Sequence, residues 1–184
     1  MFPLDNSANT TIENTPVGVY NNWVNTDVND VSMTGVSRGV FSEGNFARRV
    51  NVTGCNISAD FRGIDWENND RAINMTATGN TIKVTKPNNA QKGGTVGIFM
   101  SETNPANFAN YIIGNPDIST YSADAGIMTF GVNRALIQYN TINTYMQGAL
   151  VPATAGIYLG GGGNNTVDCN TANNFIPVGS NTFP

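Results

Sequence analysis

Two segments, Tyr139-Asn140-Thr141-Ile142 and Ala155-Gly156-Ile157-Tyr158-Leu159, decide the fold of this 184-residue chain. Each contains an element that recurs: an Asn shortly before an apolar residue, and a Gly followed by Val or Ile. The glycine elements begin at Gly18, Gly39, Gly63, Gly97, Gly126 and Gly156. The asparagine elements, which interleave with them, begin at Asn56, Asn80, Asn115, Asn140 and Asn170. Self-similarity at 20 to 50 residues is typical of a solenoid whose repeats bury their apolar faces only by stacking.

The repeats have the composition and periodicity of strands. The pattern around each glycine has a period of two, which is the side-chain period of a β-strand. Thr, Val and Ile are common, whereas the helix formers Glu, Lys, Gln and Leu are scarce. Gly and Asn, such as Gly79-Asn80 and Gly160 to Gly163, separate the segments and suit turns with a positive φ. The expectation is an all-β solenoid.

The alternation of the two elements resembles the right-handed parallel β-helix superfamily, which includes pectate lyases, polygalacturonases and phage tailspikes. The stretch from Gly162 to Thr171 is also similar to β-helix repeats of secreted Bacteroidota surface proteins. The resemblance implies a single-stranded right-handed parallel β-helix of about six to seven coils. It also implies a ladder of stacked asparagines, because a side-chain amide can donate and accept hydrogen bonds in a buried turn. The expected rungs are Asn56, Asn80, Asn115, Asn140 and Asn170.

The length fits one domain, residues 1–184. We expect residues 1–16 to form an N-terminal cap or extension, residues 17–172 to form the coils and residues 173–184 to form the C-terminal end. A stack of strands has open edges at both ends, and these must be covered to prevent association. The expected partners are therefore other protein subunits or the rest of a longer chain.

The composition excludes several classes of protein. Asn and Thr number 29 and 20, hydrophobic residues make up 40%, and the net charge is −4, which disfavours a disordered chain and a nucleic-acid-binding surface. Histidine is absent, and with it the Ser-His and Cys-His pairs of nucleophilic catalysis. No apolar run is long enough to insert into a membrane. The Asn-rich, Lys-poor composition favours an extracellular, cell-surface or virion location.

The glycine elements predict which side chains face inward. If the residue after each glycine is buried, an aliphatic column results from Val19, Val40, Ile64, Ile98, Ile127 and Ile157. The next residue then faces outward, and this second column consists of Tyr20, Phe41, Asp65, Phe99, Met128 and Tyr158. Because an exposed apolar stripe normally marks a contact site, its five apolar members are the candidate binding residues. The alternative is that the N-terminal segment or the excursion from Thr85 to Thr95 covers the stripe.

The two cysteines stand at similar places in the repeat. Cys55 directly precedes Asn56, and Cys169 directly precedes Asn170, several coils further along. At about 4.8 Å per stacked strand they would be ~19 Å apart, whereas a disulfide requires Cα atoms within about 7 Å. The expectation is two free and largely buried thiols.

One acidic cluster could support chemistry. Asp65 and Glu67 alternate along a strand, so both face outward, and paired carboxylates perform acid and base catalysis in glycoside hydrolysis. Gly63-Ile64-Asp65 resembles a segment that follows the catalytic residues of polygalacturonases, although Arg62 stands where that family has Asp. The lyase resemblance implies calcium held by Asp65, Glu67 and Asp70, with Arg62 or Arg71 as the base. The alternative interpretation is a solvated charged patch with no catalytic residue, metal or cofactor.

We therefore expect a non-catalytic structural or adhesive β-helix module of a secreted, cell-surface or phage-fibre assembly. The alternative is a polysaccharide-binding or polysaccharide-degrading β-helix, acting as a lyase or glycoside hydrolase through Asp65, Glu67 and Arg62. Whether the chain is an enzyme is left open by the sequence, since the recurring elements determine a scaffold and not a reaction.

Overall fold

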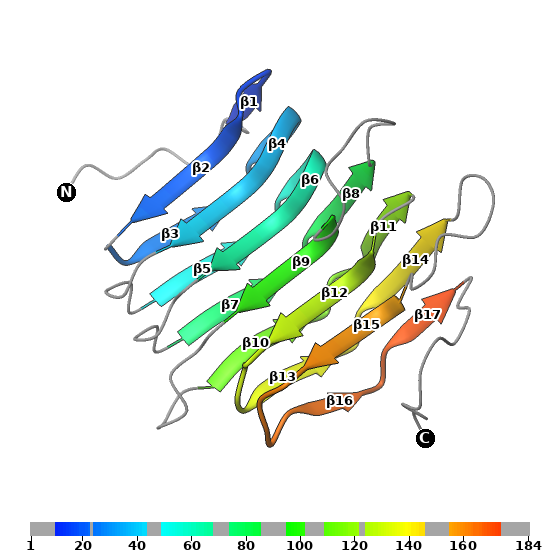
Figure 1. Cartoon of the computed structure of the whole chain (residues 1–184). Coiled ribbons are helices and arrows are strands. Elements are labelled where there is room, and N and C mark those ends of the chain that lie inside the picture. The colour runs from blue at the N-terminus through cyan, green and yellow to red at the C-terminus, as the bar shows by residue number, and fades with distance from the viewer. Residues whose placement is uncertain are drawn as a thin grey trace.

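The computed structural model describes residues 10–22, 24–43, 49–67, 74–85, 95–101, 109–121, 124–145 and 155–173. These residues form strands and turns without a helix, and every strand pairing among them is parallel (Figure 1). The expected all-β chain with parallel strands is thereby confirmed. Across the same ranges, no helix is long and apolar enough to cross a membrane.

The strands fall into three series that the chain visits in turn. The glycine strands, which carry the Gly-Val or Gly-Ile dipeptides, are β2 (Val17–Asn22), the second half of β4 (Ser32–Glu43), the second half of β6 (Asn56–Glu67), β9 (Val96–Ser101), β12 (Ala125–Phe130) and β15 (Ala155–Gly160). The strands of the second sheet are β3 (Thr26–Asn29), β5 (Arg49–Thr53), β7 (Asn74–Thr78), β10 (Ala109–Ile113), β13 (Ala135–Gln138) and β16 (Thr166–Asp168). The return strands are β1 (Thr11–Glu13), the first halves of β4 and β6, β8 (Thr81–Thr85), β11 (Asp117–Tyr121), β14 (Thr141–Tyr145) and β17 (Thr171–Asn173).

The sheet connectivity is less regular than the repeat predicts. The second sheet has six strands in the order β16-β13-β10-β7-β5-β3, but the glycine strands and the return strands belong to one eleven-stranded sheet. The cause is that β4 and β6 run through the bend between the two series without interruption, each over 12 residues. Irregular pairing around Val36, next to Gly35 with a φ of 61°, accommodates the bend in β4.

The two recurring elements contact each other in the fold, which explains why both are present. A Cβ atom added to Gly97 would lie 2.5 Å from Cγ2 of Ile118 and 2.6 Å from the carbonyl oxygen of Gly126. Gly63 and Gly126 are crowded in the same way by Ile82 and by Ile142. These isoleucines begin the return strands that follow the asparagines. The glycine is therefore required because the isoleucine of the next repeat occupies the space of its side chain.

The residues after the glycines form the predicted aliphatic column. They pair in direct register from Val19 to Ile157, strand by strand. The four central members are fully buried and Ile157 is nearly so, while Val19 packs against the core as a partly buried residue. This inward orientation is confirmed.

Stacked asparagines connect the second sheet to the return strands. Oδ1 of Asn115 accepts hydrogen bonds from the backbone N–H and from Nδ2 of Asn80, both at 3.0 Å. Asn140 accepts the same pair from Asn115, and Asn170 accepts it from Asn140. Each Nδ2 also donates to a carbonyl of the second sheet, as Asn80 does to Val52. The turns between sheets thus have satisfied polar groups although they are buried.

Asn56 lies outside this asparagine ladder, in contrast to the expectation. Because Asn56 pairs with Thr81, the residue aligned with Asn80 is Cys55. The backbone N–H of Cys55 donates to Oδ1 of Asn80, and its Sγ contacts the carbonyl of Val28 at 3.5 Å, where an asparagine would place Nδ2. Asn56 is exposed. The sequence interpretation was wrong by one residue because Cys55 replaces the amide at this rung.

The two cysteines also differ by one residue in their alignment with the asparagine ladder. Both thiols are free, but Cys55 is buried and Cys169 is exposed, so the expected burial of both was wrong. Thr141 pairs with Thr171, which places Cys169 at the level of Tyr139, in the turn before the ladder. Both of these turn residues have a positive φ, 53° for Cys169 and 55° for Tyr139. Cys169 therefore occupies an outward turn position and Cys55 an inward rung.

The ends of the chain differ in part from the expected boundaries. Strand pairing begins at Thr11, which pairs with Ser32, and so lies within the segment expected to be a cap. The last paired strand ends at Asn173, next to the expected end of the coils. Residues 1–9 and 174–184, on which the expected caps depend, lie outside the described residues.

Candidate functional site

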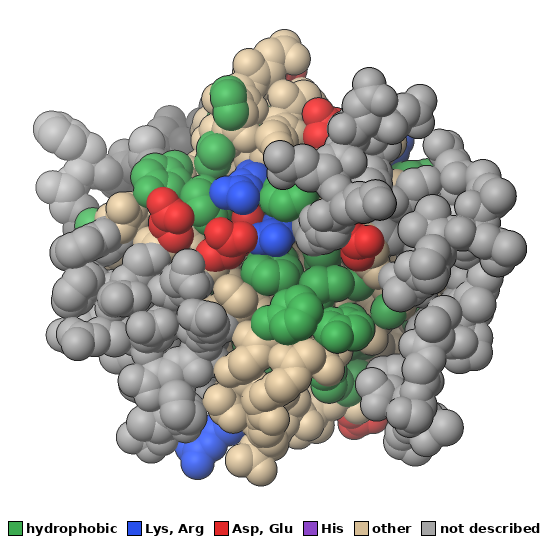
Figure 2. All heavy atoms as spheres, viewed as in Figure 1, with side chains coloured by type: hydrophobic (Ala, Val, Ile, Leu, Met, Phe, Trp, Pro, Cys, Tyr) green, Lys and Arg blue, Asp and Glu red, His purple; other side chains and the backbone are tan. Residues whose placement is uncertain are grey.

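The outward side chains of the glycine strands form the surface that we call the front surface. The residues two positions after each glycine pair in direct register and make its central column: Tyr20, Phe41, Asp65, Phe99, Met128 and Tyr158. The structure thus brings all five candidate binding residues, and Asp65, into one line across six strands. Figure 2 shows this face, where acidic and basic side chains lie together among hydrophobic ones.

The central column is not the continuous exposed stripe that the sequence predicts. Only its two ends are open, with Tyr20 at 52% and Tyr158 at 42% exposure, whereas Phe41, Phe99 and Met128 are buried. Phe99 and Met128 pack with Val96 and Ala125 in a small cluster separate from the main core. Tyr20 and Arg38 lie against Phe41, and Phe130 and Arg62 lie against Phe99. The excursion considered as a cover, residues 86–94, lies outside the described residues.

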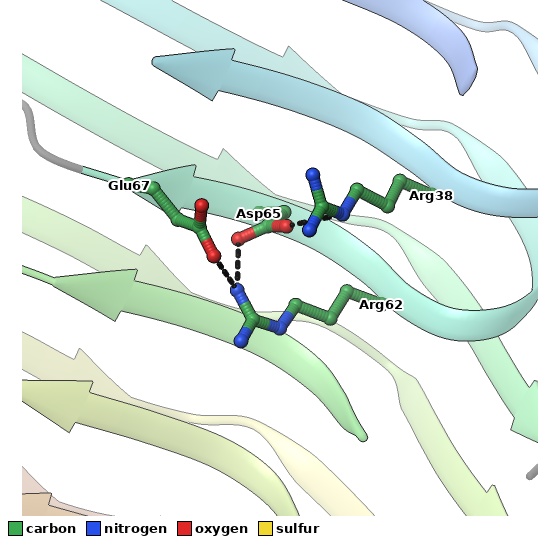
Figure 3. Close-up of polar contacts among 4 residues, drawn as sticks. All are labelled: Arg38, Arg62, Asp65 and Glu67. Atoms are coloured by element: carbon green, nitrogen blue, oxygen red, sulfur yellow. Dashed lines mark hydrogen bonds and ion pairs between the residues drawn. The ribbon is translucent and has the colours of Figure 1, made fainter. Parts of the chain in front are cut away.

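Asp65 interrupts the column and is bound by two arginines (Figure 3). Nη1 of Arg62, on the same strand, donates to Oδ1 of Asp65 at 2.6 Å. Nε of Arg38, on β4, lies 3.0 Å from Oδ2. This second contact is an ion pair that lacks hydrogen-bond geometry, since Oδ2 has no hydrogen-bond partner. Nη1 of Arg62 also donates to Oε1 of Glu67, so that one guanidinium bridges two carboxylates.

Burial dominates the electrostatics of Asp65. Its side chain is fully buried, and loss of hydration raises its pKa to about 6, because a buried carboxylate favours the neutral form. The charges of Arg62 and Arg38 oppose this shift, and the charge of Glu67 reinforces it. The carboxyl group therefore changes charge in a range of pH where ordinary aspartates stay ionised.

Aromatic rings surround both arginines. The guanidinium carbon of Arg62 lies 3.7 Å from the ring centroid of Phe99 and 4.7 Å from that of Phe61. Arg38 lies 4.2 Å from Phe41 and 5.3 Å from Phe61. Such cation–π contacts hold a guanidinium in place and reduce its hydration. We call the group of Arg38, Arg62, Asp65 and Glu67, with these rings, the charged cluster.

A second feature lies further along the front surface. The ring centroid of Phe130 lies 6.1 Å from that of Phe99 and 5.4 Å from that of Tyr158. Phe130 is 41% exposed, and it follows the central column by two residues on β12. Phe99, Phe130 and Tyr158 thus form a group of three rings with two open members, which we call the ring patch.

The charged cluster bears on the catalytic and metal alternatives. The structure places Asp65, Glu67 and Arg62 together, but Asp65 is inaccessible and both carboxylates contact Arg62. A divalent cation would have to displace that guanidinium, so this donor set does not fit calcium. Among the described residues, no group of three or more His, Cys, Asp or Glu side chains could hold a metal ion. Asp70, the third ligand of the calcium alternative, and Arg71 lie outside those residues.

Three residues of the front surface were not predicted from the sequence. Arg38 pairs with Arg62 across β4 and β6, and this alignment follows from the glycines that each precedes. Phe130 stands four residues after Gly126, a position that the column of second residues does not include. Phe61 lies at the bend of β6, where the period of two is interrupted. Arg38 could have been found by extending the aligned repeats one residue before each glycine, and Phe130 by extending them two residues beyond the central column.

No protein-family model, curated protein or solved structure matches the chain.

Proposed function

We propose that this chain is a right-handed parallel β-helix module with a structural or adhesive role, without catalytic activity, in a secreted, cell-surface or phage-fibre assembly. Support for the β-helix comes from the parallel pairing of three strand series and from the asparagine ladder, which repeats from Asn80 to Asn170. Its six to seven coils would form one domain. The scarcity of charge, 12% of the residues, suits a stack in which like charges would lie about 4.8 Å apart.

The ring patch is the observation that carries the adhesive role. Phe130 and Tyr158 expose about two fifths of their surfaces on neighbouring strands, and Phe130 also contacts Phe99 on β9. Large open rings next to one another are typical of surfaces that bind a partner, because aromatic side chains bury much apolar area at little entropic cost. The expected partner is another protein subunit that docks on this surface.

Light scattering on the purified chain tests this role. Substitution of Phe130→Ser together with Tyr158→Ser should lower the mass of any assembly toward that of the monomer. Tyr139→Ser is the control, because Tyr139 is an even more open ring, 62% exposed, in a turn outside the glycine strands. A mass unchanged by the double substitution at every concentration would overturn docking through the ring patch.

Polysaccharide binding is the second candidate, and the spacing of the rings favours it. The ring centroids of Phe130 and Tyr158 lie 5.4 Å apart, and both side chains are about two fifths exposed, so that one sugar ring can contact both. A glycan array with the natural chain and the same two variants separates the candidates. Binding of a polysaccharide that is lost with Phe130→Ser and Tyr158→Ser would support this candidate over subunit docking.

The non-catalytic part of the proposal has its own test. Polysaccharides are incubated with the chain, with and without calcium, and unsaturated products are followed by absorbance and reducing ends by a colorimetric assay. We expect no cleavage. Cleavage that is abolished by Asp65→Asn with Glu67→Gln would replace the proposal by the enzymatic alternative.

A further inference from the structure

The guanidinium of Arg38 has donors that the fold does not use. Its Nε faces Asp65, and within the described part of the chain neither of its two Nη nitrogens has a hydrogen-bond or ion-pair partner. The side chain is 27% exposed, and its other contacts are the faces of Phe41 and Phe61. A guanidinium presents its terminal N–H groups as a planar fork that matches two oxygens of an anion.

The surroundings of Arg38 keep this fork in place and restrict its hydration. Phe41 belongs to the same strand, and Phe61 lies on the next strand, where it also contacts Arg62. A partly desolvated cation held by packed rings binds an anion more strongly than a mobile arginine in water does, because the interaction is less screened and less side-chain entropy is lost. Figure 2 shows basic side chains at the surface of this face.

We propose that Arg38 is the centre of a binding site for an oxyanion, a carboxylate or sulfate group of a ligand, on the front surface. The anion accepts hydrogen bonds from the two Nη groups while Nε keeps its contact with Asp65. This site does not depend on the ring patch or on the proposed docking role, since it uses different side chains on β4 and β6.

The negative charge of Asp65 opposes the binding of an anion to the same guanidinium. The charged groups on the two strands are Arg38 and Glu43 on β4, and Asp60, Arg62, Asp65 and Glu67 on β6, whereas the flanking β2 and β9 carry no Asp, Glu, Lys or Arg. With Asp65 ionised, two cations of the charged cluster face two carboxylates. With Asp65 protonated, the charged cluster itself carries one more positive charge than negative charges. Binding should therefore strengthen as the pH falls through the pKa of Asp65, about 6.

An NMR titration of the arginine side chains tests the site. Sodium acetate and, separately, sodium sulfate are added at constant ionic strength, and the Arg38 Nε resonance is followed at pH 5.0 and pH 7.5. We expect a saturable shift with a Kd about tenfold lower at pH 5.0, because the competent protonation state is then the major one. The stronger of the two probes identifies the ligand group as planar or tetrahedral.

Three variants make the result decisive. Arg38→Gln should abolish the saturable shift, monitored then at Arg62, while Arg49→Gln should not, because Arg49 pairs with Asp27 on the second sheet. Asp65→Asn removes the opposing charge without removing a donor to the anion. It should bind acetate or sulfate at pH 7.5 at least as tightly as the natural chain does at pH 5.0.

Two outcomes would overturn the proposal. One is a shift that does not saturate, or that persists in Arg38→Gln. The other is an Asp65→Asn variant that is folded by circular dichroism but binds no more tightly at pH 7.5 than the natural chain. Neither outcome concerns the mass of the assembly, so failure of this site and failure of the docking role are distinguishable.

Discussion

At the scale of single residues, Asn115 shows how much one side chain can organise. Its Oδ1 accepts two hydrogen bonds from Asn80, and its Nδ2 donates to the carbonyl of Ala77 and to Oδ1 of Asn140. The residue is fully buried, so water cannot replace any of these partners. The loss of one of these bonds is therefore costly mainly because it leaves a buried donor or acceptor without a hydrogen-bond partner.

Substitution Asn115→Ala should accordingly cost about 3 kcal/mol of unfolding free energy, because it leaves at least two buried donors of Asn80 without an acceptor. Urea denaturation followed by circular dichroism measures this loss. Asn29→Ala is the control, since Asn29 is exposed, and it should change stability by less than about 0.5 kcal/mol. Equal effects of the two substitutions would show that the ladder is not a source of stability.

Asp65 links stability to pH. Its pKa is raised from 3.8 to about 6 in the folded chain, so the folded state binds a proton more tightly than the unfolded state does. The resulting stabilisation is fully present below pH 3.8 and is lost as the pH rises through 6. Between pH 7 and pH 5, this group should add about 1 kcal/mol to the unfolding free energy.

The measurement is urea unfolding at both pH values for the natural chain and for Asp65→Asn. The variant has no titrating group at this position, so its stability should change less between pH 7 and pH 5, by about the same 1 kcal/mol. A pH dependence identical in the two proteins would mean that the arginines hold Asp65 ionised throughout.

At the scale of strands, the glycines determine how closely the glycine strands pack against the return strands. Ile118 of β11 fills the space beside Gly97 of β9, and the same arrangement recurs between Gly126 and Ile142. The glycine strands approach the return strands this closely only because the glycine has no side chain. The two sequence elements are thus two halves of one packing contact.

Gly97→Ala should therefore destabilise the chain by about 2 kcal/mol, since the new methyl group must displace Ile118 or the backbone of the neighbouring strand. Thermal or urea unfolding detects the change. Gly163→Ala is the matched control, because a Cβ atom there would meet only Oδ1 of Asn133, at 3.6 Å, and no positive φ is required. A Gly97→Ala variant as stable as Gly163→Ala would contradict the packing argument.

At the scale of the whole molecule, stability should vary along the stack. A strand such as β9 pairs with β6 on one side and β12 on the other, while among the described strands β17 pairs with β14 alone. In a stack of this kind, each repeat is stabilised mainly by its nearest neighbours. Hydrogen exchange should therefore show amides of β9 and β12 exchanging at least about 100-fold more slowly than those of β17. Uniform exchange along the chain would indicate a single cooperative unit.

The part of the fold that could be predicted is the part that repeats. The inward column from Val19 to Ile157 follows from the period of two next to each glycine, and the strand pairing preserves it. The ladder position in the first rung was missed, because Cys55 performs the role of an asparagine and the nearest Asn is one residue away. The bend of β4 and β6 was missed as well, since no glycine or proline marks where a continuous strand turns in β6.

The candidate site was only partly predictable for a different reason. The sequence alone determined which residues share the central column, because identical spacing from each glycine places side chains in line. Only the tertiary structure decided which of them are accessible. Arg38 and Arg62 come together because β4 and β6 are neighbours, and they then lie on Phe41, Phe61 and Phe99. Alternation determines the face of a side chain, whereas its exposure depends on contacts across strands that are distant in the sequence.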